Sequence, residues 1–428
     1  MRRAPRLFTP RAAGFFAAAL GLYVAGRLTG AAELYMLALA CLALLGGSYL
    51  VVRWGNYRLA CSRTVRPVRV SQGGRIAVTI RLVNSSRLET GVLLLEDRLP
   101  YQLGTPARFV VPGIGGEDKA LLHYELPATH RGRYTIGPLA VRLVDPFGLA
   151  QAGSELAGTS EVIVHPRVEP LPPHALGGEL ASAAATRVRH LFSQGDEFYT
   201  TREYRDGDDL RKVHWRSSAK RGQLMIRQEE RPWQARALLA LDLRHAAHRG
   251  QGGAASFERT VSIAASIALR LGQSGYEIGL VTDDGHQVRP PGSVDQATAI
   301  LDFLASVEPS RLASLEPLAQ RLSRTSGEGL LIAVLAVPSP DEAAVLARCR
   351  LGFAGALGLL VRTDSWVGLA SREVAAADAR AAGIAGLLER AGWRTAMITR
   401  TEQLDEPWRR LTAPSGRATA LTTHRYSR

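Results

Sequence analysis

Lysine and cysteine are scarce in this chain of 428 residues. Only three of its 53 basic residues are lysines, so its positive charge is carried almost wholly by arginine. Its three cysteines, Cys41, Cys61 and Cys349, are odd in number and widely separated. This spacing suits neither a disulfide framework nor a zinc site, and it is typical of a protein in a reducing compartment.

Motifs of three common enzyme classes are also missing. The sequence has no Gly-x-x-x-x-Gly-Lys phosphate loop, no Gly-x-Ser-x-Gly nucleophile turn and no His-Glu-x-x-His zinc helix. These absences argue against the corresponding nucleotide-binding, acyl-transfer and zinc chemistries. The sequence therefore gives no reason to expect a bound cofactor.

Positive charge is in excess, but it is not distributed as nucleic-acid binding requires. The formal net charge is +14. Residues 1–70 carry ten arginines and one acid, Glu33, which accounts for nine of the fourteen surplus charges. A nucleic-acid-binding domain would be expected to concentrate its basic residues on a folded surface. We therefore predict no nucleic-acid partner.

Two uncharged runs lie inside this arginine-rich part. Residues 12–26 contain no charge, and residues 34–52 give 19 more uncharged residues. A helix of that second length is about 28 Å long, close to the roughly 30 Å hydrocarbon core of a bilayer. We predict a transmembrane hairpin in residues 1–62, with spans at about 12–30 and 34–52. A cleaved signal peptide is the alternative interpretation of the first run.

Arginines flank the predicted hairpin unevenly. Four precede the first span and five follow the second within residues 53–69, whereas the connecting turn carries only Arg27 and Glu33. The positive-inside rule then places both ends of the hairpin in the cytoplasm. We expect the membrane to be a partner of this protein and its soluble domains to be cytoplasmic.

Residues 64–168 have a period of two. Ile76, Val78, Ile80 and Leu82 occupy every second position of one run. Further short runs, separated by turn signals, lie at residues 92–95, 121–126, 134–136, 140–144 and 162–165. About seven short strands over roughly a hundred residues indicate a β-sandwich of immunoglobulin type. Residues 169–186, rich in Pro, Gly and Ala, are predicted to be a linker.

Short apolar runs alternate with helical patterns in the rest of the chain. The runs lie at residues 238–243, 278–282, 330–337, 357–361 and 395–398. The helical patterns comprise a helix capped by Ser256, followed by residues 294–307, 314–323, 341–349 and 372–390. This alternation predicts βαβ units and a mostly parallel, doubly wound α/β sheet.

The segment 195–231 combines eight acids with nine bases in 37 residues. Aromatic residues are interleaved with the charges at Phe198, Tyr199, Tyr204 and Trp215. A disordered charge run would lack aromatics and would usually carry one sign. We predict a folded network in which Arg202 and Arg211 pair with Asp208 or Asp209. Trp215 is expected to anchor the segment against the α/β domain.

Twelve residues of this segment resemble the signature of the domain of unknown function 58. They are Gly195, Phe198, Arg202, Tyr204, Gly207, Asp208, Asp209, Arg211, Trp215, Ser218, Ala219 and Lys220. A second group resembles the upstream motif of the same family: Arg131, Gly132, Tyr134, Gly137, Pro138, Asp145, Pro146, Phe147 and Gly148.

The resemblance implies a setting for the protein. Proteins of that family are bacterial, often membrane-anchored, and typically encoded beside MoxR-type AAA+ ATPases. Their C-terminal part is similar to von Willebrand factor A domains. We therefore expect a multi-pass protein of the bacterial inner membrane whose residues 187–428 hold the charged motif and a von Willebrand factor A-like domain. A MoxR-type ATPase is the implied partner.

The resemblance also implies a metal site, from which this sequence departs. In metal-binding von Willebrand factor A domains, an Asp that ends the first strand opens an Asp-x-Ser-x-Ser motif with oxygen ligands for Mg²⁺. Here Asp242 is followed by Leu243, Arg244, His245 and Ala246. Both hydroxyls are lost and one position carries a cation. We predict a degenerate site at Asp242 without a metal.

Two other sets of polar residues have both a catalytic and a structural interpretation. Asp208, Asp209 and His214 are a possible acid–base set. The arginines around them favour ion pairing instead. His245 and His248 are possible metal ligands, but the sequence places no carboxylate beside them.

Asp283 and Asp284 follow the second predicted strand of the α/β domain and precede a glycine. An Asp-Asp-Gly sequence is typical of a turn. We therefore interpret both residues as turn residues rather than ligands.

Three functions are compatible with these features. The first is a membrane-anchored, non-enzymatic scaffold or interaction protein that works with a MoxR-type ATPase in assembly or chaperone-like work. The second is a hydrolase or nucleic-acid-processing enzyme that uses the charged motif. The third is a magnesium-dependent adhesion module. The sequence leaves the client and the oligomeric state open.

Overall fold

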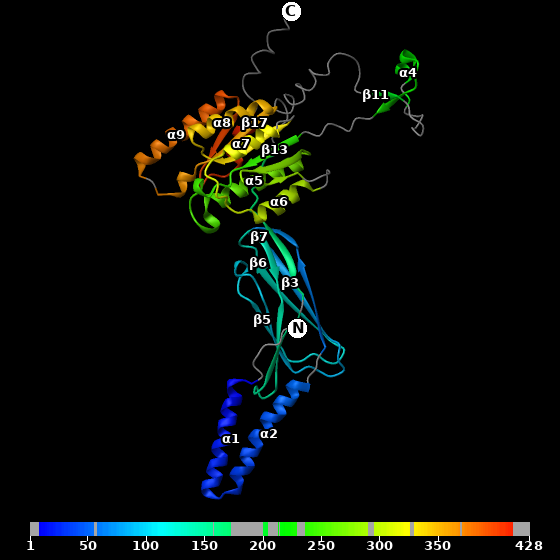
Figure 1. The fold of residues 1–428 in the computed structure, drawn as a ribbon, viewed down its shortest axis with the longest axis vertical. Coiled ribbons are helices and arrows are strands. Elements are labelled where there is room, and N and C mark those ends of the chain that lie inside the picture. Colours follow the sequence, from blue (N-terminus) through cyan, green and yellow to red (C-terminus); the bar gives the residue numbers. More distant parts are fainter. Residues whose placement is uncertain are drawn as a thin grey trace, which may run out of the picture. The chain divides into compact units, whose positions relative to one another are not determined.

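The computed structural model describes residues 8–54, 58–156, 158–172, 200–203, 213, 215–228, 236–289, 295–325, 329–368 and 370–413. The chain forms two compact units, Met1–Arg167 and Val168–Arg428. Figure 1 shows the elements of each unit along the chain.

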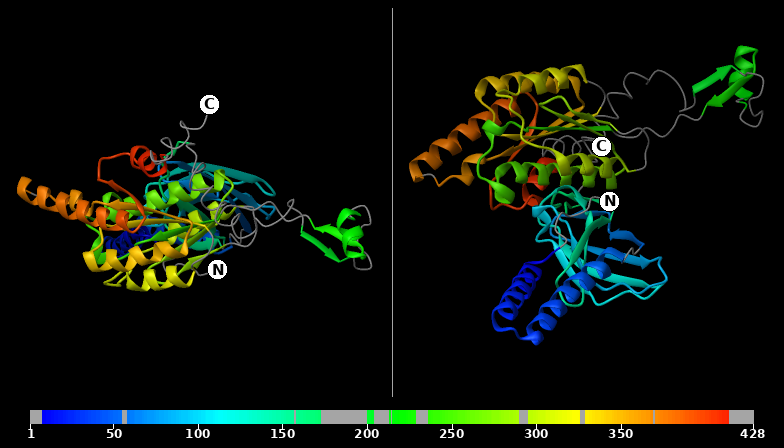
Figure 2. Two further views of the ribbon diagram at one scale, coloured as in Figure 1. Left: turned by 90° about the horizontal axis from the view of Figure 1, so that it is seen from above. Right: turned by 60° about the horizontal axis from the view of Figure 1, so that its bottom comes forward.

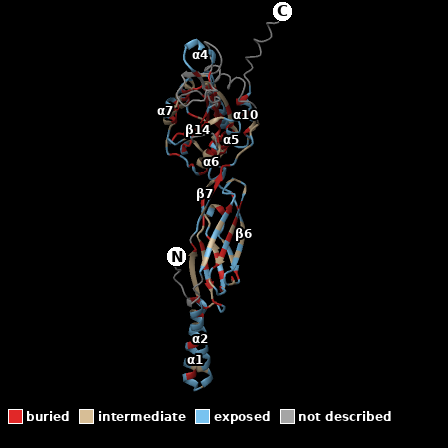
Figure 3. Ribbon diagram, turned by 90° about the vertical axis from the view of Figure 1, so that its right-hand side faces the viewer, coloured by how far each residue is buried: buried red, intermediate tan, exposed pale blue. Residues whose placement is uncertain are grey.

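Two helices open the first unit. Helices α1 (Pro10–Thr29) and α2 (Ala32–Trp54) pack side by side and are joined by a tight turn at Gly30, whose φ is 74°. Both are long and apolar enough to cross a membrane. Their bounds lie within two residues of the predicted spans. Most of their side chains are exposed, as the pale blue of Figure 3 shows.

A β domain follows the helices in the first unit. Its described strands form three sheets with the orders β1-β3-β6, β2-β10-β7 and β5-β4-β8-β9. The elements are β1 (Leu59–Arg66), β2 (Arg69–Ser71), β3 (Arg75–Asn84), β4 (Val92–Asp97), η1 (Tyr101–Leu103), β5 (Ala107–Val111), β6 (Lys119–Pro127), β7 (Gly132–Ile136), β8 (Leu139–Val144), β9 (Gln151–Leu156) and β10 (Ser160–His165). Apolar side chains from all three sheets, such as Ile80, Leu95 and Val162, share one core.

The predicted β-rich region is confirmed, but its first strand begins earlier than the sequence indicated. Strand β1 starts at Leu59, inside the range predicted for the hairpin. The more buried side of β1 carries residues 59, 61, 63 and 65. Three of these are the apolar Leu59, Cys61 and Val65, and the fourth is Arg63. A charged residue at an inward position breaks the alternation on which strand prediction depends. Strands β2, β5 and β9 were not predicted either.

The second unit contains a six-stranded sheet with the order β15-β14-β13-β16-β17-β18. Its strands are β13 (Arg236–Leu241), β14 (Glu277–Thr282), β15 (Gln287–Val288), β16 (Leu330–Ala336), β17 (Gly355–Val361) and β18 (Arg394–Ile398). All neighbours are parallel except β14 and β15. In chain order the arrangement is 3-2-1-4-5-6, so the connections change direction between β13 and β16.

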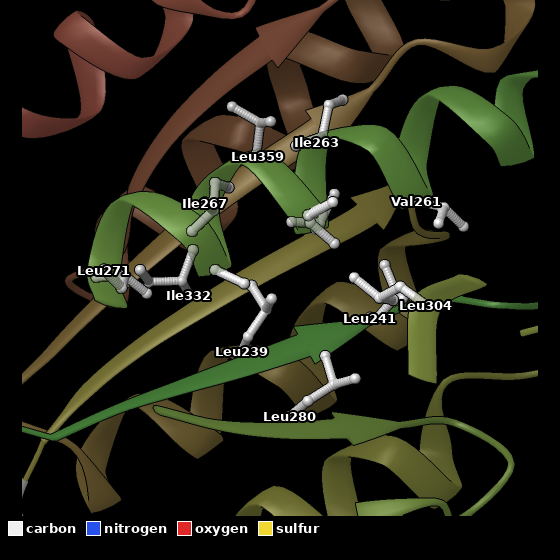
Figure 4. Packing of buried hydrophobic residues seen from close by; sticks show 14 of the residues in the cluster. Leu239, Leu241, Val261, Ile263, Ile267, Leu271, Leu280, Leu304, Ile332 and Leu359 are labelled. Atoms are coloured by element: carbon white, nitrogen blue, oxygen red, sulfur yellow. The ribbon is translucent and has the colours of Figure 1, made fainter. Parts of the chain in front are cut away.

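Helices cover both faces of this sheet. They are α5 (Ser256–Gln273), α6 (Gln296–Ser306), α7 (Glu316–Arg324), α8 (Pro340–Cys349), α9 (Ser371–Arg390) and α10 (Asp405–Thr412), with short 3-10 turns η3 (His245–Ala247), η4 (Gly252–Ala254), η5 (Arg350–Gly352) and η6 (Thr363–Trp366). Leu239 and Leu241 pack with α5 on one face (Figure 4), and Leu238 and Ala240 pack with α7, α8 and α9 on the other. Because both faces are covered, the strands are continuously apolar.

This alternation of strands and helices confirms the predicted α/β sheet, with two differences. The short strand β15 and helix α10 were not predicted. The N-cap of α5 is Ala255, whereas Ser256 was predicted to cap it. Ser256 is instead the first helical residue, and its hydroxyl accepts a hydrogen bond from Arg249 N at 2.9 Å.

Glu169, the first residue of the predicted linker, is fixed within the second unit. Its carboxylate pairs with Arg259 of α5 and accepts a hydrogen bond from Leu404 N at 3.0 Å. Its own N–H donates to Ser266 Oγ at 2.9 Å. Residues 173–186 of the predicted linker lie outside the described residues.

Candidate functional site

The charged motif is described only in part. Strands β11 (Thr200–Glu203) and β12 (Met225–Gln228) pair antiparallel, and α4 (Trp215–Arg221) lies beside them (Figure 2). The backbone of Arg202 pairs with that of Ile226. The other motif residues that lie outside the described part are Gly195, Phe198, Tyr204, Gly207, Asp208, Asp209 and Arg211, together with His214.

Ser218 of α4 connects this helix to β12. Its hydroxyl accepts a hydrogen bond from Met225 N at 2.8 Å, and both residues are buried. Val213 is buried as well. The motif therefore has a small interior of its own, built around a serine that the resemblance singled out.

Trp215 opens α4, and its predicted anchoring against the α/β domain stays a prediction. Its side chain is 71% exposed. Its described neighbours on α4 include Arg216, Lys220 and Arg221, which are exposed too. A helix of seven residues with mostly polar and charged side chains offers no apolar surface to cover an indole. The described part of α4 therefore exposes one aromatic ring and three cations.

The second candidate is the carboxyl end of β13, at the point where the strand order reverses. Ligands of open α/β sheets bind at this edge. Asp242 follows β13 directly and is fully buried. Arg244 binds it through two bonds, from Nε to Oδ1 and from Nη2 to Oδ2, each 2.9 Å long. The N–H of Ala336, the last residue of β16, also donates to Asp242 Oδ2, at 3.2 Å.

The third nitrogen of this guanidinium contacts another element. Arg244 Nη1 donates to Glu342 Oε1 at 2.5 Å, while Glu342 Oε2 accepts from Ser339 N in the capping box of α8. Burial alone would lower the pKa of Arg244, but the bonds to Asp242 and the charges of Asp242 and Glu342 raise it. The guanidinium therefore remains charged and joins the end of β13 to α8, while Asp242 joins β13 to β16.

Asp283 lies at the same edge, after β14. Its Oδ1 accepts from Leu243 N at 3.3 Å and its Oδ2 accepts from Ser310 Oγ at 2.6 Å. Burial raises its pKa; the Ser310 bond opposes this and the charge of Asp242 adds to it. The predicted turn is present, since Gly285 N donates to Thr282 O. The sequence did not indicate that Asp283 also accepts hydrogen bonds from Leu243 and Ser310, although consecutive parallel strands bring their carboxyl ends to one edge.

His248 is also part of this cluster. Its Nε2 lies 3.2 Å from Asp242 O, and its Nδ1 lies 3.2 Å from Ser256 Oγ. Burial lowers the pKa of the imidazole, which is therefore neutral near pH 7. A neutral ring donates from Nε2 to the carbonyl and accepts at Nδ1 from the hydroxyl, so both nitrogens have partners. His245, the other predicted ligand candidate, is exposed.

The carboxyl edge of the sheet therefore carries its own cation, the side chain of Arg244. Arg244 forms ion pairs with two carboxylates at this edge, Asp242 and Glu342. In the part of the chain that the structure describes, no group of three His, Cys, Asp or Glu side chains is arranged to hold a metal ion. A cavity of about 540 Å³ opens nearby between Asp284, His286, Phe303 and Arg311.

Comparison with known proteins gives a family but no activity. Residues 200–335 match the family described as "Protein of unknown function DUF58". The uncharacterized protein YeaD of Bacillus subtilis strain 168 is 25% identical over 233 residues, which are 52% of this chain and 55% of YeaD. The chain thus aligns with about half the length of that relative.

Among solved structures, a CARDB domain from Pyrococcus furiosus is 18% identical and has a TM-score of 0.20, with 25% of this chain and 88% of that domain covered. The C-terminal domain of wzt is 8% identical and has the same TM-score, 0.20, with 26% and 78% covered. Scores of this size support no structural argument.

Proposed function

This chain belongs to the DUF58 family, and we propose that it is a membrane-anchored, non-enzymatic interaction protein that works with an AAA+ ATPase of MoxR type. One observation carries the proposal. At the switch point of the sheet, where an α/β enzyme binds its ligand, Arg244 pairs with Asp242 and Glu342 and is only 6% exposed. This ion pair takes up both oxygens of Asp242, the residue at which a ligand or metal would be expected.

The anchoring part of the proposal rests on α1 and α2. Their length and apolar composition suit a membrane hairpin. The arginines that flank the hairpin favour a cytoplasmic location for both units. In a bacterial inner membrane this orientation presents the second unit to ATPases of the cytoplasm.

The von Willebrand factor A-like interpretation of the second unit gives it an interaction role. Its support is the sheet order together with Asp242 at the end of the first strand. In that interpretation Arg244 takes the place of the metal, so adhesion through Mg²⁺ is disfavoured. Binding would then use another surface.

The exposed end of α4 is the surface we assign to the partner. Tryptophan and arginine are the residues that most often dominate the energy of protein–protein interfaces. Trp215 is largely exposed, and Arg216, Lys220 and Arg221 are exposed on the same short helix. This combination is complementary to an acidic surface with an apolar pocket.

Binding of the purified full-length protein in detergent to the MoxR-type ATPase from the same organism tests the proposal. Biolayer interferometry should give saturable binding that Trp215→Ala weakens by about 30-fold or more, since interface hot spots contribute at least about 2 kcal/mol. Tyr101→Ala, which removes another exposed aromatic side chain (86% exposed), is the matched control and should leave binding unchanged. No binding by the wild type would refute the partnership.

A further inference from the structure

The turn between β8 and β9 is held by a buried carboxylate. Asp145 accepts hydrogen bonds from Phe147 N at 3.0 Å and from Ala150 N at 2.6 Å. Burial alone would raise the pKa of Asp145, but these bonds outweigh it and lower the pKa. The carboxylate is therefore ionised at neutral pH and fixes residues 145–150 in one conformation.

This turn binds the start of α1. Thr9, the N-cap of the helix, donates from its N–H to Leu149 O at 3.0 Å and from Oγ1 to Gly148 O at 2.7 Å. Phe8 forms an antiparallel bridge with Ala150. The helix thus begins on the β domain itself, with no free residues between the two.

The pairing of strands places a second loop at the same end of the β domain. Val92 of β4 lies opposite Val144 of β8, so residues 85–91 run beside the β8–β9 turn. Ser85 N donates to Arg58 O at 2.8 Å, which places this loop next to the start of β1 as well. The turn, the loop and the start of α1 therefore share one end of the domain.

Large apolar side chains are exposed at this end. Phe147 on the turn is 59% exposed, Leu88 on the loop is 72% exposed, and Phe8 is 51% exposed where it stacks on Tyr49 of α2. Exposed apolar side chains that gather on one surface usually mark a contact with another molecule or a membrane.

The charges around these side chains have both signs. Arg11, Arg58 and Arg87 are exposed at this end. The acidic residues Glu89, Glu117 and Asp118 are exposed there too. The net charge at this end of the domain therefore does not determine what binds there. The exposed apolar side chains determine it.

The helix beside them indicates what covers them. Arg27 is sixteen positions after Arg11 on α1, which corresponds to about 24 Å of helix, somewhat less than the roughly 30 Å thickness of the hydrocarbon core. If Arg27 lies at one interface, then Arg11, Thr9 and the turn that binds Thr9 lie at the other. Trp, Phe and Leu side chains are typical of protein surfaces that are buried at that level of a bilayer.

We propose that the Phe147 turn and the Leu88 loop insert into the headgroup region of the bilayer, so that the β domain rests on the membrane surface from which the hairpin descends. This inference rests on the proposed membrane anchoring. It also gives the upstream motif at residues 145–148 a role: the Asp145 carboxylate holds Phe147 at a fixed depth relative to α1.

Photo-crosslinking of the full-length protein in phosphatidylcholine nanodiscs tests the inference. Benzoylphenylalanine replaces Phe147, Leu88, Leu39 or Tyr101 in separate variants, and lipid adducts are counted by mass spectrometry after irradiation. Leu39 is 68% exposed in the middle of α2 and reports on the hairpin. Tyr101 is 86% exposed beyond the other end of β4 and is the matched aromatic control.

Lipid adducts at positions 147, 88 and 39, at least tenfold more frequent than at position 101, are expected. Adducts at position 39 without adducts at 147 and 88 would overturn the inference and leave the anchoring intact. An absence of adducts at position 39 would overturn the anchoring itself. Equal yields at positions 147 and 101 would also refute the inference, because they would indicate unspecific contact with lipid.

Discussion

Each unit of this protein buries an arginine against an aspartate, but the two pairs lie in different surroundings. In the β domain, Arg63 and Asp97 have side chains that are 2% and 0% exposed. In the α/β sheet, Arg244 and Asp242 are 6% and 0% exposed. Both pairs use two parallel N–H···O bonds. Their chemistry is the same and their position in the fold is not.

The pair in the β domain is surrounded by backbone acceptors. Arg63 Nη1 donates to Ile136 O at 3.1 Å and to Gly158 O at 2.6 Å, while Tyr124 Oη donates to Asp97 Oδ2 at 2.5 Å. Burial raises the pKa of Tyr124, and its bond to Asp97 raises it further. These groups come from all three sheets, so the pair holds the sheets to one another.

The pair in the α/β unit is local in sequence and lies at an edge. Arg244 is two residues from Asp242, and its remaining contact reaches Glu342, 98 residues away, at the start of α8. This guanidinium lies where a ligand or metal would bind in related architectures. The comparison teaches that one side-chain pair can hold a core together or close a site, depending on which strand ends it joins.

Loss of Arg63 is the largest effect we expect. Arg63→Ala leaves Asp97 buried without its partner and should lower the free energy of unfolding of the β domain by about 4–5 kcal/mol, because a buried charge without a partner is strongly unfavourable. Hydrogen exchange of β3 and β4 peptides in the full-length protein in detergent measures the loss. Arg75→Ala removes an exposed pair with Glu125 and should cost less than about 1 kcal/mol. Similar losses in both variants would contradict the buried-pair account.

Arg244→Ala should have a somewhat smaller effect, about 3–4 kcal/mol in β13 and β16, because Glu342 is partly exposed and solvent compensates for it. The matched control is Arg236→Ala, whose partner Glu277 lies on the same sheet and whose loss should cost less than about 1 kcal/mol. EDTA or millimolar Mg²⁺ should leave the unfolding of the wild type unchanged. Stabilisation of the wild type by Mg²⁺ would show that the arginine does not replace a metal.

Asp283 gives the smallest effect, and it depends on pH. Its raised pKa means that the folded state retains the proton to a higher pH than the unfolded chain, whose Asp pKa is about 3.9. The stabilisation is therefore complete below that value and is lost as pH rises through the raised pKa. The Asp283→Asn variant cannot ionise at this position. The stability of its β14, compared with that of wild type at the same pH, should therefore increase as the pH rises from 4 to 7. Hydrogen exchange of β14 peptides across this range measures it; parallel profiles would contradict the prediction.

The sequence predicted the elements that obey simple periodicity. The two apolar helices and the alternating strands and helices of the second unit were found because burial on one face or all round leaves a regular apolar pattern. Strand β1 was misplaced because Arg63 lies on its inward side. A charge that is compensated by Asp97, 34 residues away, has no local signature.

The candidate site was only half predictable for the same reason. Asp242 and the cation at Arg244 were identified from the sequence alone. Their connection to Glu342 and the neighbouring position of Asp283 depend on how parallel strands and α8 meet in space. That Trp215 anchors its segment against the α/β domain stays a prediction, because the pattern of charges around an aromatic residue does not reveal which apolar surface faces it.

The position of Glu169 determines how the second unit would bear mechanical load. A pull on the chain from its N-terminal side reaches this unit at Val168, and the next residue is bonded to Arg259 in α5 and to Leu404 just before α10. Arg259 also donates to Glu402 O at 2.8 Å. Force applied at Glu169 is therefore divided between α5 and the residues that lead into α10. It passes through these two helices before it reaches the strands of the sheet.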